Sequence, residues 1–145
     1  MTVVTTFWEK RQEKQWKFER HMLGGLSLEQ LKEDAKKHFS PLFPMPVACS
    51  PYFLDPCVDT AIDAYLLGAE YSRFGYYGEK SDQVKKRCER ELNEIFYLLF
   101  DLLHPWYDYH HLTAESLVIA VQYFVERWWE KGFLEGKKHH KLRLL

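Results

Sequence analysis

Three carboxylates recur at helical spacing near the middle of the chain. Asp59, Asp63 and Glu70 are separated by four and seven residues, which places them on one face of an α-helix. Carboxylates that converge from a buried helix can bind a hard divalent cation. The same pattern describes the solvated face of a helix that is apolar elsewhere. A di-metal carboxylate bundle would add a Glu-x-x-His motif, which this sequence lacks.

A second group of metal-ligand residue types follows further along. It combines histidines with carboxylates, a set that suits zinc or iron, and consists of Asp101, His104, Asp108, His110 and His111. By helical angle Asp101 points away from the apolar stripe of its own helix, and a histidine such as His104 is favoured near a helix C-terminus whatever else it does. One hypothesis is therefore a metal-dependent hydrolase, whose divalent ion would be held by Asp59, Asp63 and Glu70 with His104 or His110.

Composition and motifs restrict the other chemistries. The chain has 145 residues, 20 Lys and Arg against 21 Asp and Glu, and 46% hydrophobic residues, which is ordinary for one globular domain. A formal net charge of −1 makes a nucleic-acid partner improbable. The sequence contains no phosphate loop, dinucleotide-binding glycine motif or nucleophile elbow, so no organic cofactor is expected. The cofactor compatible with the residue pattern is a divalent metal ion.

The elements that must position these residues are all helical. Apolar residues recur with helical periodicity, and no convincing two-residue alternation indicates a strand. The predicted helices cover residues 7–23, 28–38, 55 to about 73 or 76, 82–103 and 114–135. We expect an all-α fold, a single compact bundle of about five helices spanning residues 1–145. The third and fourth helices should be central and the first peripheral.

Local signals mark where these helices begin and end. Ser27 followed by Gln30 has the spacing of a capping box, and Asp55-Pro56 suits the start of the third helix. Gly136 is a plausible stop for the last helix, which leaves a short basic tail at 137–145. Residues 39–54 form a proline-rich apolar loop that should pack on the body of the domain.

Cysteine usage and hydropathy bear on location. The three cysteines contain no Cys-x-x-Cys pair, which favours reduced thiols rather than a disulfide framework. The longest stretch without Lys, Arg, Asp or Glu is 39–54, and its prolines forbid a membrane-spanning helix. No signal peptide is apparent in the first 20 residues. We therefore expect a cytoplasmic protein with no membrane partner.

Several large apolar side chains lie off the predicted core faces. Trp16 lies away from Phe18 on the first helix, and Ile119 and Tyr123 lie opposite Leu117 on the last one. If they are exposed, they provide an interface for a second copy or another protein. If the helices are buried on two sides, they belong to the core. The sequence is compatible with both the interface and the core interpretation.

Two stretches resemble a known family. Residues 7–15, FWEKRQEKQ, and residues 64–78, AYLLGAEYSRFGYYG, are similar to a small family of Bacillus-type bacterial proteins described as a domain of unknown function. The resemblance extends over most of the chain and implies a cytosolic bacterial protein. It brings no catalytic residues to this sequence.

The leading prediction is a small cytosolic helical protein that interacts with other proteins or serves a structural role. It is not an enzyme, and it forms a homodimer through its aromatic surface, with Trp16, Ile119 and Tyr123 as the interface residues. The alternative is the metal-binding helical protein described above.

Overall fold

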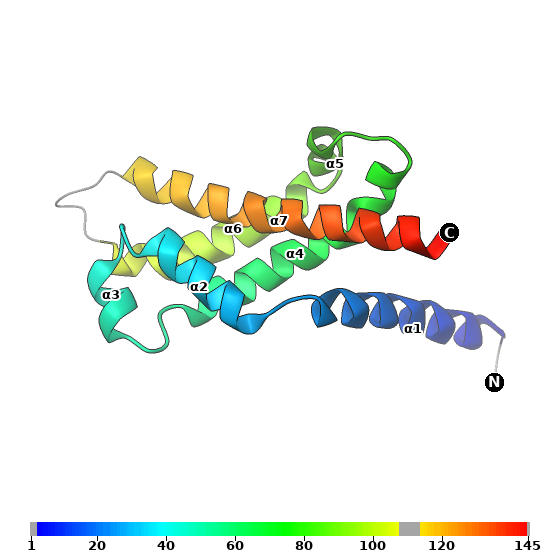
Figure 1. The fold of residues 1–145 in the computed structure, drawn as a ribbon, viewed down its shortest axis with the longest axis horizontal. Helices are drawn as coiled ribbons and strands as arrows, with labels where there is room; N and C mark the ends of the chain where they lie inside the picture. The colour runs from blue at the N-terminus through cyan, green and yellow to red at the C-terminus, as the bar shows by residue number, and fades with distance from the viewer. Residues whose placement is uncertain (1–2, 108–113, 145) are drawn as a thin grey trace.

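The computed structural model describes residues 3–107 and 114–144, and that part of the chain is helical without any strand. Seven α-helices and one 3-10 turn pack into a single body (Figure 1). Their order is α1 (Val3–Gly24), α2 (Leu28–Phe39), α3 (Pro44–Cys49), α4 (Asp55–Tyr76), α5 (Ser81–Arg87), α6 (Glu89–Leu103), η1 (His104–Trp106) and α7 (Ala114–Leu144). The all-α prediction is confirmed, whereas the expected number of about five helices is too low.

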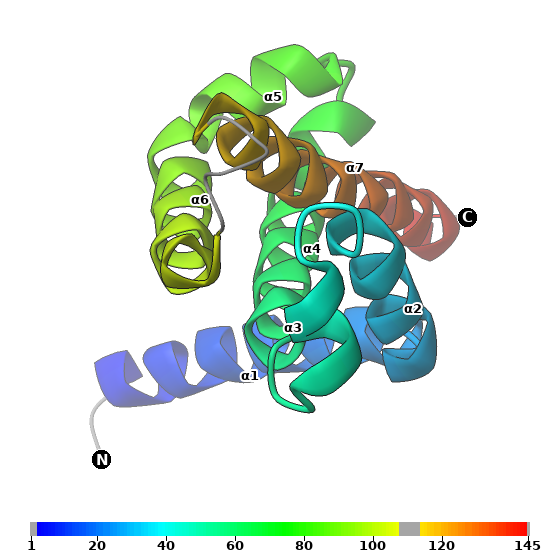
Figure 2. The same cartoon turned by 90° about the vertical axis from the view of Figure 1, so that its left-hand side faces the viewer.

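Helices α4 and α7 run side by side and form the centre of the body (Figure 1, Figure 2). Each of the two helices contributes a glycine to the contact between them, Gly68 from α4 and Gly132 from α7. A Cβ atom built on Gly132 would overlap the carbonyl oxygen of Tyr65, and one on Gly68 would overlap the carbonyl oxygen of Trp129 and lie 2.8 Å from the amide nitrogen of Phe133. Only glycine therefore allows the two backbones to approach so closely.

Further small residues extend this contact toward the C-terminal ends of both helices. A Cβ atom on Gly136 would overlap the Ser72 hydroxyl, which donates a hydrogen bond of 2.6 Å to the carbonyl oxygen of Ala69. A Cβ atom on Gly75 would overlap the ring of Phe133. Tyr65 and Gly68 lie against residues 129–133 of α7, whereas Ser72 and Gly75, later in α4, lie against residues 133–137, so the two helices are parallel (Figure 1).

Helix α2 crosses this central pair and is attached to α7 by polar groups (Figure 2). The Asp34 carboxylate accepts hydrogen bonds from Arg127 Nη2 at 2.6 Å and from the indole nitrogen of Trp128 at 2.8 Å. His38 Nε2 lies 2.7 Å from the carbonyl oxygen of Ala120. Burial of the imidazole lowers the pKa of His38, and the hydrogen bond to that carbonyl opposes the shift.

The predicted helix over residues 82–103 is interrupted at Cys88. This residue has φ −112° and ψ 23°, outside the α-helical region, and it separates α5 from α6. The break lets the Cys88 side chain remain fully buried while α6 takes a new direction. Burial raises the pKa of Cys88 to about 11 and that of Cys57 to about 12, so both thiols are protonated and unreactive at neutral pH.

Two other predicted boundaries are wrong for identifiable reasons. The loop expected over residues 39–54 contains α3, because Pro44 occupies the first helical position, where a missing N–H costs nothing. Helix α7 does not stop at Gly136 but continues to Leu144. The glycine is retained for its contact with Ser72, so the basic segment from residue 137 to residue 144 is helical rather than a separate tail.

The glycine contact generates a stability prediction. Gly68→Ala and Gly132→Ala should each lower the free energy of unfolding by about 3 kcal/mol, at the upper end of the cost of overpacking, because the new methyl group meets backbone atoms that cannot rotate away. Intrinsic helix propensity favours alanine over glycine by about 1 kcal/mol, so the sign of the effect is informative. Urea unfolding followed by circular dichroism measures it.

Gly24 provides the matched control for this pair. It ends α1, and a Cβ atom there would meet nothing within 4 Å. Gly24→Ala should therefore leave the unfolding midpoint unchanged or raise it slightly. If Gly132→Ala behaved like Gly24→Ala, the proposed close contact of α4 with α7 would be wrong.

Candidate interaction surfaces

Over residues 7–24, whose side chains the structure describes, the N-terminal helix packs on the body at its C-terminal end. Met22 is buried, and the Phe18 ring lies 5.3 Å from the ring of His139 and 5.8 Å from that of His140 on α7. Every side chain from residue 7 to residue 17 is exposed. We call residues 7–17 the arm. It projects from the body as a continuation of the anchored turns (Figure 1).

The arm has two distinct sides. One side, which we call the basic face, carries one aromatic side chain and four cations: Phe7, Lys10, Arg11, Lys14 and Lys17. The four cations follow Phe7 by three, four, seven and ten residues, and these spacings place all five side chains on the same side of an α-helix. Another side carries Trp8 and Trp16, which are 57% and 66% exposed. The guanidinium group of Arg20 lies 4.8 Å from the Trp16 ring centre. The arm therefore presents both charge and aromatic area to solvent.

A groove with acidic walls lies where α1, α4 and α6 meet. It has a volume of about 380 Å³, and we call it the acidic groove. Its floor is apolar and consists of Leu66, Leu67, Ile95 and Leu98. Its rim carries five carboxylates, from Glu19, Asp63, Glu70, Glu91 and Glu94, and no lysine or arginine is among its lining residues in the described part of the chain.

The charge on this rim is compensated only in part by nearby cations, since Arg90 Nε lies 3.5 Å from the Glu94 carboxylate and both of these side chains are exposed. Desolvation raises the pKa of Asp63, and the neighbouring Asp59 carboxylate adds to the effect. Desolvation also raises the pKa of Glu70, followed by repulsion from Glu19, while Arg73 opposes the shift. The folded chain therefore holds like charges in proximity at neutral pH. Such an arrangement is more common at functional surfaces than at purely structural ones.

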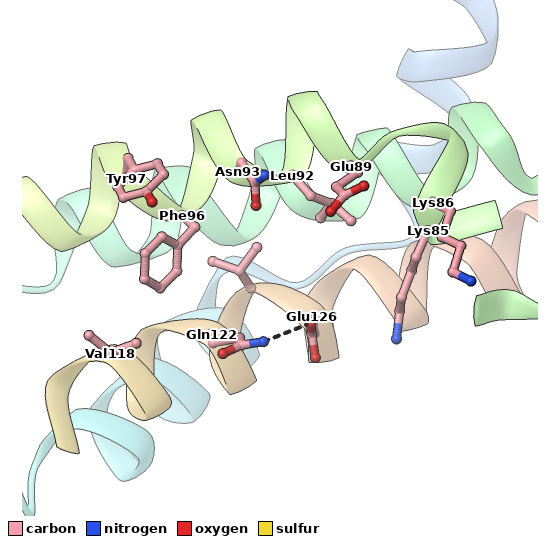
Figure 3. Close-up of a pocket in the computed structure, with 11 residues that line it drawn as sticks. Lys85, Lys86, Glu89, Leu92, Asn93, Phe96, Tyr97, Val118, Gln122 and Glu126 are labelled. Carbon is pink, nitrogen blue, oxygen red and sulfur yellow. Dashed lines mark hydrogen bonds between the residues drawn. The ribbon is translucent and has the colours of Figure 1, made fainter. Parts of the chain in front are cut away.

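A second groove separates α6 from α7 (Figure 3). It has a volume of about 410 Å³ and an apolar floor formed by Leu92, Phe96 and Val125. Figure 3 shows Lys85 and Lys86 at one end and Tyr97 and Val118 at the other. The rim is of mixed charge, because Glu89 and Glu126 alternate with Asn93 and Gln122 between these ends.

The three residues predicted to form an interface are all exposed, but they do not share one surface. Ile119 and Tyr123 are 52% and 65% exposed and lie on the first turns of α7, beside the second groove. Trp16 lies on the arm. The first turns of α7 and the arm are at opposite ends of the molecule (Figure 1). A contact with a single partner surface cannot include both groups from the same copy.

The structure brings together only part of the predicted metal set. Asp63 and Glu70 line the acidic groove, and Asp59 lies one turn away on α4. His104 is at the end of α6, with its ring 5.5 Å from that of Phe100, and is not among the residues that line this groove. His110 lies outside the described residues. Over residues 3–107 and 114–144, no three His, Cys, Asp or Glu side chains are grouped so as to hold a metal ion.

Sequence periodicity missed the residues on the opposite wall of the groove. Glu91 and Glu94 belong to α6 and Glu19 to α1, and only the tertiary fold places them beside α4. The wide apolar stripe of α6 was the available signal. It was expected to face the core, but Leu99 and Leu103 are the only residues of α6 that are buried, while Ile95 and Phe96 are half-buried. Such a stripe indicates grooves on both flanks of the helix.

Comparison with known proteins agrees with the sequence resemblance. The family described as "Protein of unknown function (DUF2521)" matches residues 1–145. The chain belongs to this family. A Bacillus subtilis (strain 168) protein described as "Uncharacterized protein YbaK" is 34% identical over 146 residues, and the match covers 99% of both chains. No solved structure matches the chain. The resemblance to a family of unknown function found in Bacillus is confirmed.

Among the helices of the described residues, none is long and apolar enough to cross a membrane.

The raised pKa values in the acidic groove generate a second prediction. Because the folded pKa of Asp63 and Glu70 exceeds the unfolded one, their ionisation lowers stability as pH rises from about 4 through the folded pKa. The double variant Asp63→Asn with Glu70→Gln should therefore be more stable than the wild type at pH 7, by on the order of 0.5 kcal/mol because solvent screens the rim. The gain should shrink toward pH 4. Urea unfolding at several pH values measures both effects.

The control is Glu33→Gln on the exposed side of α2, which removes one carboxylate away from the groove. It should not reproduce the gain. A double variant that is less stable than the wild type at pH 7 would contradict this prediction, because it would show that the fold stabilises the ionised forms of Asp63 and Glu70.

Proposed function

We propose that this protein is a small, non-enzymatic interaction protein of the cytoplasm that assembles as a homodimer. The observation that carries the proposal is the arm, a helical segment with every side chain from residue 7 to residue 17 exposed. A short helix with no packed side is only marginally stable in water. A partner surface would supply the packing that the chain itself does not provide.

The aromatic content of the arm indicates the size of this effect. Phe7, Trp8 and Trp16 are 65%, 57% and 66% exposed. Burial of apolar area contributes roughly 25 cal/mol per Å², so complete burial of each of these rings is worth about 2 kcal/mol or more. Two or three such rings per copy suffice to hold a dimer together, since they are the residue types that dominate interface energetics.

The type of surface supports an interaction role rather than catalysis. Both grooves combine an apolar floor with a charged or polar rim and lie open on the outside of helices. That is the anatomy of protein-contact surfaces, in which a hydrophobic centre is surrounded by polar groups. Family membership agrees with this proposal but adds no activity, since both the family and its Bacillus subtilis member are described without one.

Cysteine chemistry supports the cytoplasmic part of the proposal. Cys49, Cys57 and Cys88 are all unpaired, and Cys49 is exposed to solvent. An exposed free thiol persists most readily in a reducing compartment.

A substitution in the arm tests self-association. Phe7→Asp should shift the full-length chain from dimer to monomer, because it introduces a charge into the apolar contact. It should leave the helical circular dichroism unchanged, because this side chain does not contact the core. Sedimentation velocity and native mass spectrometry of the untagged protein measure the subunit number.

Two variants place this result in context. Tyr77→Asp changes an 80% exposed aromatic residue elsewhere on the surface and should leave the dimer intact. Tyr123→Asp tests whether the outer side of α7 also contributes, as the sequence analysis predicts. A wild-type chain that stays monomeric at all concentrations would contradict the proposal. A retained metal ion that is lost on Asp63→Asn or His104→Ala would favour the metal-binding alternative instead.

A further inference from the structure

We propose that the arm of one copy docks into the acidic groove of a second copy, and that the second arm docks reciprocally into the first groove. This inference rests on the proposed homodimer and specifies which surfaces form it. It makes the groove incomplete in a single chain, since the cations that would line it belong to the other copy.

Charge complementarity is the first argument. The basic face carries Lys10, Arg11, Lys14 and Lys17 and no acidic residue between them on that side of the helix. The rim of the acidic groove carries five carboxylates, and its described lining residues include no lysine or arginine, although the exposed Arg90 lies 3.5 Å from Glu94 beside it. Opposite charges of this kind steer association and fix the register of an interface. The α6–α7 groove offers no such match, because Lys85 and Lys86 stand at one of its ends.

The apolar groups correspond as well. Phe7 lies among the cations of the basic face and is 65% exposed. The floor of the acidic groove is made of leucine and isoleucine side chains, including Leu66 and Ile95, which are only half-buried in the single chain. An amphipathic helix that lays an aromatic anchor on such a floor, with cations along the rim, is a recurrent mode of recognition.

The arm cannot reach the groove of its own chain. Helix α1 is continuous from Val3 to Gly24. Glu19, on the anchored part of this helix, already lines the groove, so residues 7–17 extend away from it along the same axis. A return into the groove would require α1 to break between the arm and Glu19. The sequence contains neither Gly nor Pro from residue 7 to residue 19 to favour such a break.

A dimer with two-fold symmetry allows each arm to occupy the acidic groove of the other copy. Because Glu19 borders the groove and the arm ends at residue 17, two residues before it, each arm is joined to α1 beside the groove of its own copy. When two such copies face one another with their α1 helices antiparallel, each arm, about 15 Å long at 1.5 Å per residue, lies over the other copy's groove. An isologous dimer of this kind makes every contact twice, which doubles both the buried apolar area and the number of ion pairs.

A charge-swap experiment on the full-length chain tests the proposal. The arm variant carries Lys10→Glu, Arg11→Glu and Lys14→Glu, and the groove variant carries Asp63→Lys, Glu70→Lys and Glu94→Lys. Each variant alone should dimerise at least about 100-fold more weakly than the wild type, because like charges then face one another. An equimolar mixture of the two should recover a heterodimer, since both contacts are again between opposite charges. Sedimentation velocity measures all three dissociation constants.

The matched control reverses three exposed lysines that lie outside both surfaces. Lys32→Glu, Lys36→Glu and Lys80→Glu change the net charge as much as the arm variant does. This control should keep the wild-type dissociation constant. If it weakened the dimer as much as the arm variant, the effect would come from net charge alone and the proposal would be overturned.

Cross-linking of the wild type provides a second test that does not depend on the groove variant folding. A mixture of normal and ¹⁵N-labelled chains is treated with a carbodiimide, which joins amines directly to neighbouring carboxylates. Mixed-isotope peptides linking Lys10 or Lys14 to Asp63, Glu70, Glu91 or Glu94 are expected. A dimer whose cross-links lack these pairs, or show them only within one isotope, would overturn the docking proposal while leaving self-association standing. A strictly monomeric wild type would overturn both.

Discussion

The backbone contact between α4 and α7 is the constraint on which the other elements depend. At Gly68 and Gly132 the two helices approach until the carbonyl oxygen of one meets the Cα of the other. Two parallel helices this close leave little room for side chains between them, so the large core residues are displaced to the flanks of the pair. Trp129 and Phe133 stack there, with ring centres 5.1 Å apart, and the remaining helices are arranged around this pair.

The position of α6 follows from this arrangement and accounts for both grooves. The helix lies across α4 and α7 and buries Leu99 and Leu103. Its apolar stripe is wider than the contact, so side chains on either flank remain partly exposed. On one flank Ile95 meets α4 and the anchored part of α1, and on the other Phe96 meets α7. Grooves of this kind arise where an amphipathic helix has more apolar surface than its neighbours can cover.

Local sequence signals predicted the elements well where one physical cause acts alone. The start of α4 at Asp55 agrees with the expected start, and its end at Tyr76 is the later of the two expected ends, because a proline start and a glycine-rich end are local signals. Prediction was wrong where tertiary packing overrides the local signal. Gly136 has the chemistry of a helix stop but serves the contact with Ser72, and the break at Cys88 buries a thiol within an otherwise continuous helical pattern. The acidic groove was half-predicted: spacing places Asp63 and Glu70 on one face, but the carboxylates that α6 contributes depend on its crossing of α4.

The distribution of charge connects the fold to its proposed role. The chain is almost neutral overall, with a formal net charge of −1, and several of its cations and anions form local ion pairs, such as Arg90 with Glu94 and Lys138 with Glu135. Two surfaces depart from this pattern. Five carboxylates collect around one groove, while four cations line one face of an arm that cannot bend back to it. A sequence optimised only for the stability of the single chain would place a lysine on the groove rim, where it would relieve the desolvated Asp63 and Glu70. The raised pKa values of Asp63 and Glu70 mean that this separation lowers the stability of the single chain. In the proposed dimer the opposite charges of two copies would meet, so the same residues that oppose folding of one chain would favour association of two.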